Sequence, residues 1–258
     1  MSYTASEMMT VAAARALTST DVCFVGIGLP SAACNLARLT HAPGLRLVYE
    51  SGTIETKPTV LPLSIGDGEL CETALTTVSV PEMFQYWLQG GRISVGFLGG
   101  AQIDRFGNLN STVIGSYATP KVRLPGSGGA PEIATSCQKI YIVMRHNRRA
   151  FVERLEFLTS LGHGRTGRER QALGLTTRGP VLLVTDLCIM TPEDGTNEFV
   201  VSSLHPGVTA EQVRAETGWA VRFLPTVTET PAPTLAELAA LRDLNARTAA
   251  AHGTAAAE

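Results

Sequence analysis

The sequence predicts an α/β protein with a mainly parallel sheet flanked by helices. Several short apolar runs are suited to strands that are buried on both faces. These runs cover residues 22–25, 45–49, 93–98, 140–144 and 181–185. Glycines stand at the ends of several runs, and helical segments alternate with them, which together favour a parallel sheet covered by helices. Ligands in such sheets bind at the carboxyl ends of the strands, so the residues that follow each run are the first candidates for a site.

Capping residues and apolar spacing predict the helices. Thr4 and Glu7 form a capping box ahead of apolar residues spaced on one helix face. Residues 32–39 predict a second helix, with Pro30 near its start. Thr234 and Glu237 form another capping box. The leucines that follow at helical spacing are Leu235, Leu238, Leu241 and Leu244. We therefore expect one domain over residues 1–225, followed by a Pro/Ala-rich linker and a C-terminal helix over residues 226–258.

Composition excludes several classes of protein. Charged residues make up 17% of the chain, against about 25% in an average soluble domain, and this low content predicts that another subunit covers part of the exterior. A formal charge of −2 argues against binding to nucleic acid or to a membrane surface. The five cysteines are widely spaced, which predicts reduced, mostly buried thiols and no metal site. The N-terminus lacks signal-peptide features, so we expect a cytoplasmic protein.

Glu50 is the most informative single residue. It follows the apolar run that ends at Tyr49 and precedes Ser51 and Gly52. A carboxylate at the end of a buried strand is costly unless it is solvated, hydrogen bonded or used in chemistry. Because a carboxylate carries its charge at neutral pH, it can act as a nucleophile without an adjacent base. The alternative is a structural glutamate that caps the next segment.

Three glycine-rich stretches favour close approach of the backbone to a ligand. Gly26 and Gly28 follow the first run, but Ser31 stands where a dinucleotide fingerprint needs its third glycine. That turn therefore either joins strand to helix or lies against some other ligand. Gly99 and Gly100 also follow a buried run. Residues 126–130 have the composition of an oxyanion hole, in which consecutive N–H groups face the ligand, and equally that of a flexible surface loop.

Two basic segments remain open to interpretation. Residues 162–170 form a glycine-rich loop with three arginines, which suits either contact with phosphate groups or a solvated loop. Arg145, His146, Arg148 and Arg149 follow a predicted strand, and we expect them to form a surface cluster.

The order of these motifs resembles the β subunits of family I CoA-transferases over about residues 5–225. The motifs that carry the resemblance are Gly26–Pro30, Tyr49–Gly52, Gly99–Thr112 and Gly126–Ala130. The segment Leu204–Thr209 is similar to the members that act on 3-oxoadipate in aromatic-compound breakdown, and the glutaconate members come next. The resemblance implies the fold shared with sugar-phosphate isomerases and an α subunit encoded separately.

The resemblance also implies a mechanism. Glu50 is implied as the nucleophile that forms a glutamyl-CoA thioester, with the Gly129 N–H beside the oxyanion and Gly128 shaping the loop. The residues implied along the CoA and substrate path are Gly26, Gly28, Gly99, Gly100 and Gln102. No metal and no permanently bound cofactor is implied, since acyl-CoA is the substrate. The implied reaction moves CoA from succinyl-CoA to 3-oxoadipate, and the alternatives are a glutaconate-type or other dicarboxylate transferase and a CoA-thioester hydrolase.

Overall fold

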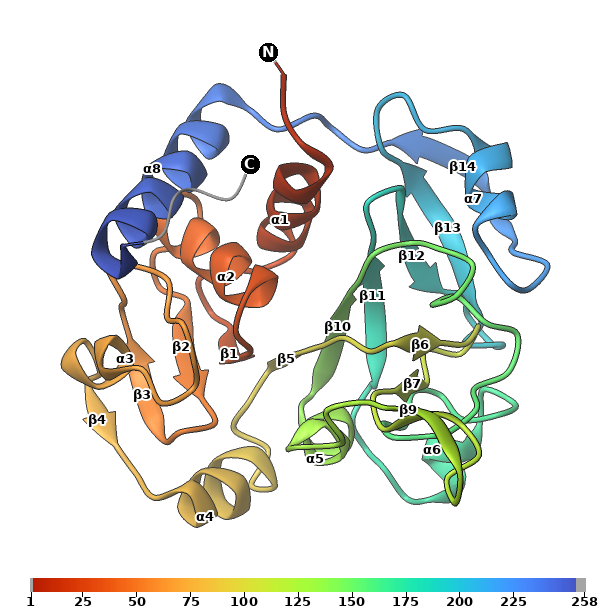
Figure 1. The fold of residues 1–258 in the computed structure, drawn as a ribbon, viewed down its shortest axis with the longest axis horizontal. Coiled ribbons are helices and arrows are strands. Elements are labelled where there is room, and N and C mark those ends of the chain that lie inside the picture. Colours follow the sequence, from red (N-terminus) through yellow and green to blue (C-terminus); the bar gives the residue numbers. More distant parts are fainter. Residues whose placement is uncertain (1, 254–258) are drawn as a thin grey trace. The chain divides into compact units, whose positions relative to one another are not determined.

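The computed structural model describes residues 2–253. Contacts divide the chain into two compact units. Unit 1 comprises the residues up to Phe97 together with the C-terminal segment from Ala232, and unit 2 comprises Leu98–Pro231. Figure 1 shows that strands and helices contribute to both units.

The strands of unit 1 lie in the order β5-β1-β2-β3-β4. Their bounds are β1 Val22–Val25, β2 Arg46–Tyr49, β3 Thr53–Thr56, β4 Thr76–Thr77 and β5 Val95–Leu98. β1 pairs in parallel with both β2 and β5, whereas β3 pairs antiparallel with β2 and β4. The three apolar runs predicted here as buried strands are therefore confirmed.

Three helices of unit 1 pack on one another (Figure 1). They are α1 Ala5–Arg15, α2 Leu29–Leu39 and α8 Leu235–His252. The shorter elements between β3 and β5 are α3 Gly68–Glu72, α4 Val80–Glu82 and the π-helix η1 Met83–Leu88. Both predicted capping boxes are confirmed, at the starts of α1 and α8. Arg15 of α1 forms an ion pair with Glu237 of α8 at 2.7 Å, which ties the two ends of the chain together within unit 1.

Unit 2 contains a second group of strands in the order β14-β13-β12-β11-β10. Their bounds are β10 Lys139–Val143, β11 Pro180–Val184, β12 Cys188–Pro192, β13 Phe199–Leu204 and β14 Phe223–Glu229. β10 with β11 and β13 with β14 are parallel pairs, and β12 is antiparallel to both of its neighbours. The boundary expected at residue 225 falls inside β14.

Small hairpins and short helices complete unit 2. The hairpins pair β6 Gln102–Ile103 with β7 Leu109–Asn110, and β8 Val113–Gly115 with β9 Pro120–Arg123. The helices are α5 Ala130–Ser136, α6 Glu169–Ala172 and α7 Ala210–Ala215.

The predicted α/β class is confirmed. Parallel pairing is found around β1 and between β10 and β11, and the antiparallel pairs lie further out in each strand order. All five cysteines are free, and four of them are buried, which confirms the expected environment for all but the exposed Cys71.

Candidate active site

Glu50 lies in the tight turn that joins β2 to β3. The Gly52 N–H donates to the Tyr49 carbonyl oxygen at 3.0 Å and closes the turn around Glu50 and Ser51. The buried Tyr49 hydroxyl is hydrogen bonded to Ser31 Oγ of α2 at 3.0 Å. The turn is thus anchored to both the sheet and a helix, so the backbone of Glu50 is fixed at the carboxyl end of β2.

The half-buried Glu50 side chain has no structural partner. Its carboxylate forms no hydrogen bond or ion pair with any residue in the described range 2–253. A glutamate that caps a neighbouring segment would accept such a bond. The geometry therefore favours a carboxylate held for chemistry over the capping interpretation.

Gly52 is required by the turn for two reasons. Its φ of +105° is a conformation that side chains rarely adopt. A Cβ atom at this position would also lie 2.0 Å from the Val78 carbonyl oxygen, because Val78 donates its N–H to the Gly52 carbonyl at 2.9 Å. The close approach of these two backbone segments sets the path of the chain directly after Glu50.

We expect Gly52→Ala to lower the free energy of unfolding by at least about 2 kcal/mol, since it adds both backbone strain and a backbone clash. Urea unfolding of the purified protein measures the loss. Gly68→Ala in the same unit is the matched control, because nothing lies within 4 Å of its Cβ position. Equal stability of the two variants would show that the turn relaxes and does not constrain Glu50.

Two buried hydroxyl groups flank Glu50 without partners. Ser51 Oγ and Thr53 Oγ1 are buried and form no hydrogen bond within the described part of the chain, and Thr53 is only 1% exposed. Buried hydroxyls are nearly always hydrogen bonded in folded proteins, so unpaired ones mark a place where a ligand or water completes the bonding. Ser51 was predicted only as part of a motif, and Thr53 was not singled out from the sequence.

Gly26 and Gly28 share an edge of the sheet with Glu50. β1 and β2 are parallel, with Val25 opposite Tyr49, so the residues that follow each strand are neighbours across the edge. Gly28 has a φ of +80°, and no atom lies within 4 Å of its Cβ position. Unit 1 alone therefore brings the predicted glycine turn and the predicted nucleophile together, with open space beside the turn.

The predicted path residues of unit 2 have packing roles of their own. A Cβ on Gly99 would lie 3.1 Å from the Val143 carbonyl oxygen, and one on Gly100 would lie 3.1 Å from that of Asn110. Gln102 is 4% exposed; its amide donates to Glu156 at 2.9 Å and accepts from Asn110 at 2.8 Å. These contacts favour a role for Gln102 in positioning the β6–β7 hairpin.

The loop before α5 presents free backbone donors. It is anchored at Gly126, which donates its N–H to the Ser111 carbonyl at 2.9 Å and accepts from Ser111 Oγ at 2.8 Å. Gly126 and Gly128 both have positive φ, and nothing lies within 4 Å of either Cβ position. In the part of the chain that the structure describes, the N–H groups of Gly128 and Gly129 have no acceptor. An oxyanion hole needs such preorganised, unoccupied donors.

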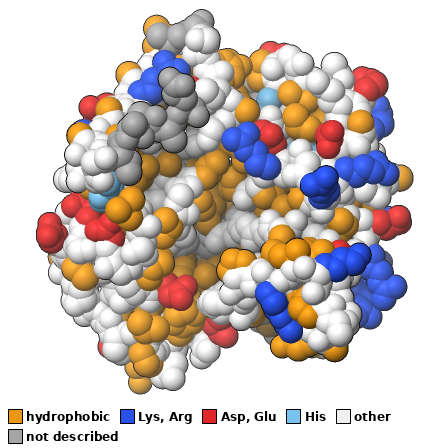
Figure 2. All heavy atoms as spheres, in the orientation of Figure 1, with side chains coloured by type: hydrophobic (Ala, Val, Ile, Leu, Met, Phe, Trp, Pro, Cys, Tyr) orange, Lys and Arg blue, Asp and Glu red, His pale blue; other side chains and the backbone are white. Residues whose placement is uncertain are grey.

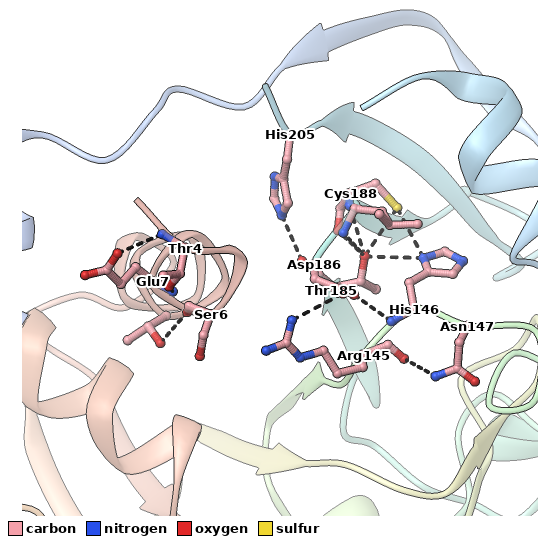
Figure 3. A network of polar contacts seen from close by, with 12 residues as sticks. Thr4, Ser6, Glu7, Arg145, His146, Asn147, Thr185, Asp186, Cys188 and His205 are labelled. Atoms are coloured by element: carbon pink, nitrogen blue, oxygen red, sulfur yellow. Dashed lines mark hydrogen bonds and ion pairs between the residues drawn. The ribbon is translucent and has the colours of Figure 1, made fainter. Parts of the chain in front are cut away.

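A buried polar network forms around His146 (Figure 3). His146 is 5% exposed and stacks on Phe151 at 3.7 Å, so the expectation that it belongs to a surface cluster is wrong. Its Nε2 is 2.9 Å from Thr217 Oγ1, and its Nδ1 is 3.3 Å from Thr185 Oγ1. His205 approaches the same strand end, with Nε2 2.8 Å from the Thr185 carbonyl oxygen. The two imidazoles hold the loops that follow β10, β11 and β13.

Burial lowers the pKa of His146 to about 4, with the nearby Asp186 carboxylate opposing the shift. The unfolded chain binds a proton below about pH 6.5 that the folded imidazole takes up only near pH 4, so stability should fall across this window. We expect a loss of about 3 kcal/mol from this group, measured by urea unfolding between pH 7 and pH 4. His146→Gln should flatten that dependence; an unchanged pH slope would mean that other groups govern it.

Metal-site and membrane-span criteria give no match in residues 2–253. No group of three or more His, Cys, Asp or Glu side chains is placed to hold a metal ion, and none of the described helices is long and apolar enough to cross a membrane.

Comparison with known proteins identifies the family. The family model for coenzyme A transferases matches residues 6–216. This chain belongs to that family. The transferase chain is 66% identical over 251 residues to the β subunit of the 3-oxoadipate CoA-transferase of Pseudomonas knackmussii, with 97% of this chain and 96% of that protein covered.

A second relative of this transferase has a solved structure. The chain is 37% identical over 225 residues to the β subunit of the glutaconate CoA-transferase of Acidaminococcus fermentans, covering 84% and 83% of the two chains. The crystal structure of glutaconate coenzyme A-transferase from the same organism superimposes with a TM-score of 0.87 at 33% identity, over 93% of this chain and 94% of that one. The resemblance inferred from the sequence motifs is confirmed.

Proposed function

We propose that this chain is the β subunit of a CoA-transferase that moves CoA from succinyl-CoA to a dicarboxylic acid, namely 3-oxoadipate. The observation that carries the proposal is the unpartnered Glu50 carboxylate on a fixed turn, in a chain 66% identical to the corresponding subunit of a 3-oxoadipate CoA-transferase. The acid is taken from that relative, and the chemistry is supported by the position of Glu50.

The reaction proceeds through covalent intermediates on Glu50. Its carboxylate attacks the thioester carbonyl of succinyl-CoA, and the C–S bond breaks to give a mixed anhydride and the CoA thiolate. The thiolate then attacks the Glu50 carbonyl, releasing succinate and leaving a glutamyl-CoA thioester. The carboxylate of 3-oxoadipate reverses these two steps, so CoA leaves on the second acid and Glu50 is regenerated.

Backbone N–H groups stabilise the charge that develops at each attack. We assign Gly129 as the donor to the oxyanion and Gly128 as the residue that shapes its loop, because their N–H groups are unoccupied. Gly26 and Gly28 leave open space at the edge that also carries Glu50. Together with Gly99 and Gly100 they form the backbone path for the pantetheine arm, with Gln102 positioning it.

The enzyme works with an α subunit. The relatives in this family are each named as one subunit of a transferase, and a low content of charged residues fits an exterior that a partner covers. Acyl-CoA is a substrate and not a resident cofactor. The free cysteines are typical of the reducing cytoplasm, where we place the enzyme.

The test is to trap the thioester. The α–β complex is incubated with succinyl-CoA and then with borohydride, which reduces a glutamyl-CoA thioester to an alcohol, and peptide mass analysis locates the change. We expect the modification at Glu50 and transfer to 3-oxoadipate in preference to glutaconate. Release of free CoA without an acyl-CoA product would identify a hydrolase, and an unmodified Glu50 after inactivation would overturn the covalent mechanism.

A further inference from the structure

Unit 2 contains a pocket of about 570 Å³ that the proposed chemistry does not use. Three segments line it: the turn Asp104–Asn108, the strand-like segment Glu153–Leu158, and Gly164 with Arg165 of the basic glycine-rich loop. The volume lies within the range of roughly 300–1,000 Å³ that is typical of small-molecule sites. Figure 2 shows Lys and Arg side chains next to apolar ones on the surface of this unit.

The carboxylates of the pocket are already engaged by the protein. Asp104 accepts from the backbone and the side chain of Asn108 at 2.9–3.1 Å. Glu156 accepts from Gln102 at 2.9 Å, and Glu153 forms an ion pair with Arg105 at 2.8 Å. Their oxygens are therefore taken up before any ligand enters.

Two arginines of the pocket are not engaged. Arg154 and Arg165 are exposed and form no ion pair or hydrogen bond with any of the described residues. Unpaired guanidinium groups at the rim of a pocket suit phosphate, which they bind with paired N–H donors. Apolar surface for a flat ring lies beside them, in Phe106 and in Phe157, which is itself stacked on Tyr117 at 5.4 Å. The pocket thus offers cationic and aromatic surface together.

The same backbone supports both this pocket and the loop that carries Gly129. Thr159 follows the lining segment, and its hydroxyl accepts from the Ser111 N–H at 2.9 Å and contacts Thr112 Oγ1 at 2.7 Å. Ser111 in turn holds Gly126 at the base of that loop. A ligand that occupies both places must be long, with a reactive carbonyl at one end and an anionic, aromatic group at the other.

We propose that this pocket binds the adenosine and phosphate groups of the CoA thioester, with Arg154 and Arg165 contacting the phosphates. The inference rests on the proposed CoA-transferase function, and it assigns the basic glycine-rich loop to phosphate contact. The positions of Phe106 and Phe157 supply surface for the purine ring.

The α–β complex is tested with Arg154→Gln, Arg165→Gln and the double variant. Arg168→Gln is the matched control, because Arg168 is exposed in the same loop but lies outside the pocket lining. The double variant should raise the KM for succinyl-CoA by about tenfold or more, since a hydrogen bond to a charged group contributes about 1.5–3 kcal/mol. The kcat value and the KM for the acid should stay within about twofold. An unchanged KM for succinyl-CoA, or an equal rise in the control, would overturn the proposal.

Two further measurements separate the possible outcomes. With 3′-dephospho-succinyl-CoA, loss of the variants' effect assigns the contact to the 3′-phosphate, and persistence assigns it to the diphosphate. Calorimetry with adenosine 3′,5′-bisphosphate tests the pocket without any transfer reaction, so arginine-dependent binding in a complex that transfers no CoA would sustain the pocket and reject the proposed function. Dissociation of the double variant from the α subunit would show that the pocket is a subunit interface and would refute the proposal.

Discussion

Glu50→Ala should lower CoA transfer by at least about 10³-fold, because it removes the nucleophile on which every step of the proposed reaction depends. The fold should survive, since the half-buried carboxylate has no partner within residues 2–253 and the turn is held by other groups. Steady-state rates of the α–β complex with succinyl-CoA measure the loss, and circular dichroism checks the fold.

Shorter and neutral side chains at the same position make the test specific. Glu50→Gln keeps the size of the side chain without its charge and should be as inactive as the alanine variant. Glu50→Asp moves the carboxylate by about 1 Å, which is enough to cost about 10²-fold. Glu72→Gln, at an exposed glutamate of the same unit, should leave the rate unchanged. Activity within tenfold of the native enzyme in Glu50→Asp would contradict a nucleophile held at a fixed point.

Local signals in the sequence predicted the elements whose cause is local. The capping boxes at Thr4 and Thr234 each involve residues three positions apart, and both form as predicted. The buried strands were found because every residue of such a strand is apolar, as in Val95–Leu98. β3 was not predicted, because Thr53–Thr56 is short and polar and its pairing depends on distant partners such as Val78.

The same distinction divides the candidate site. Glu50 stands out in the sequence because a charge follows an apolar run, and the structure places it at the strand end as expected. The orphaned Thr53 hydroxyl has no sequence signal, because its lack of a partner is a property of the folded packing. His146 was misplaced because its charged neighbours suggest a surface, whereas its burial depends on Phe151, Thr185 and Thr217.

Gly129→Pro should lower kcat by about 10²–10³-fold with a small effect on KM, because it removes the N–H assigned to the oxyanion. The substitution suits the backbone: Gly129 has a φ of −81°, close to the value that proline adopts, and the residue before it is a glycine without a Cβ to clash. Its N–H has no acceptor in the described structure, so no internal hydrogen bond is lost.

Gly129→Ala separates the lost donor from the added bulk. Alanine adopts the same φ without strain and keeps the N–H, so we expect its kcat to exceed that of the proline variant by at least about tenfold. Rates at saturating succinyl-CoA and 3-oxoadipate give kcat for both variants, and light scattering confirms assembly with the α subunit. If alanine and proline lower kcat equally, the loop acts through its shape and the oxyanion donor must be sought elsewhere.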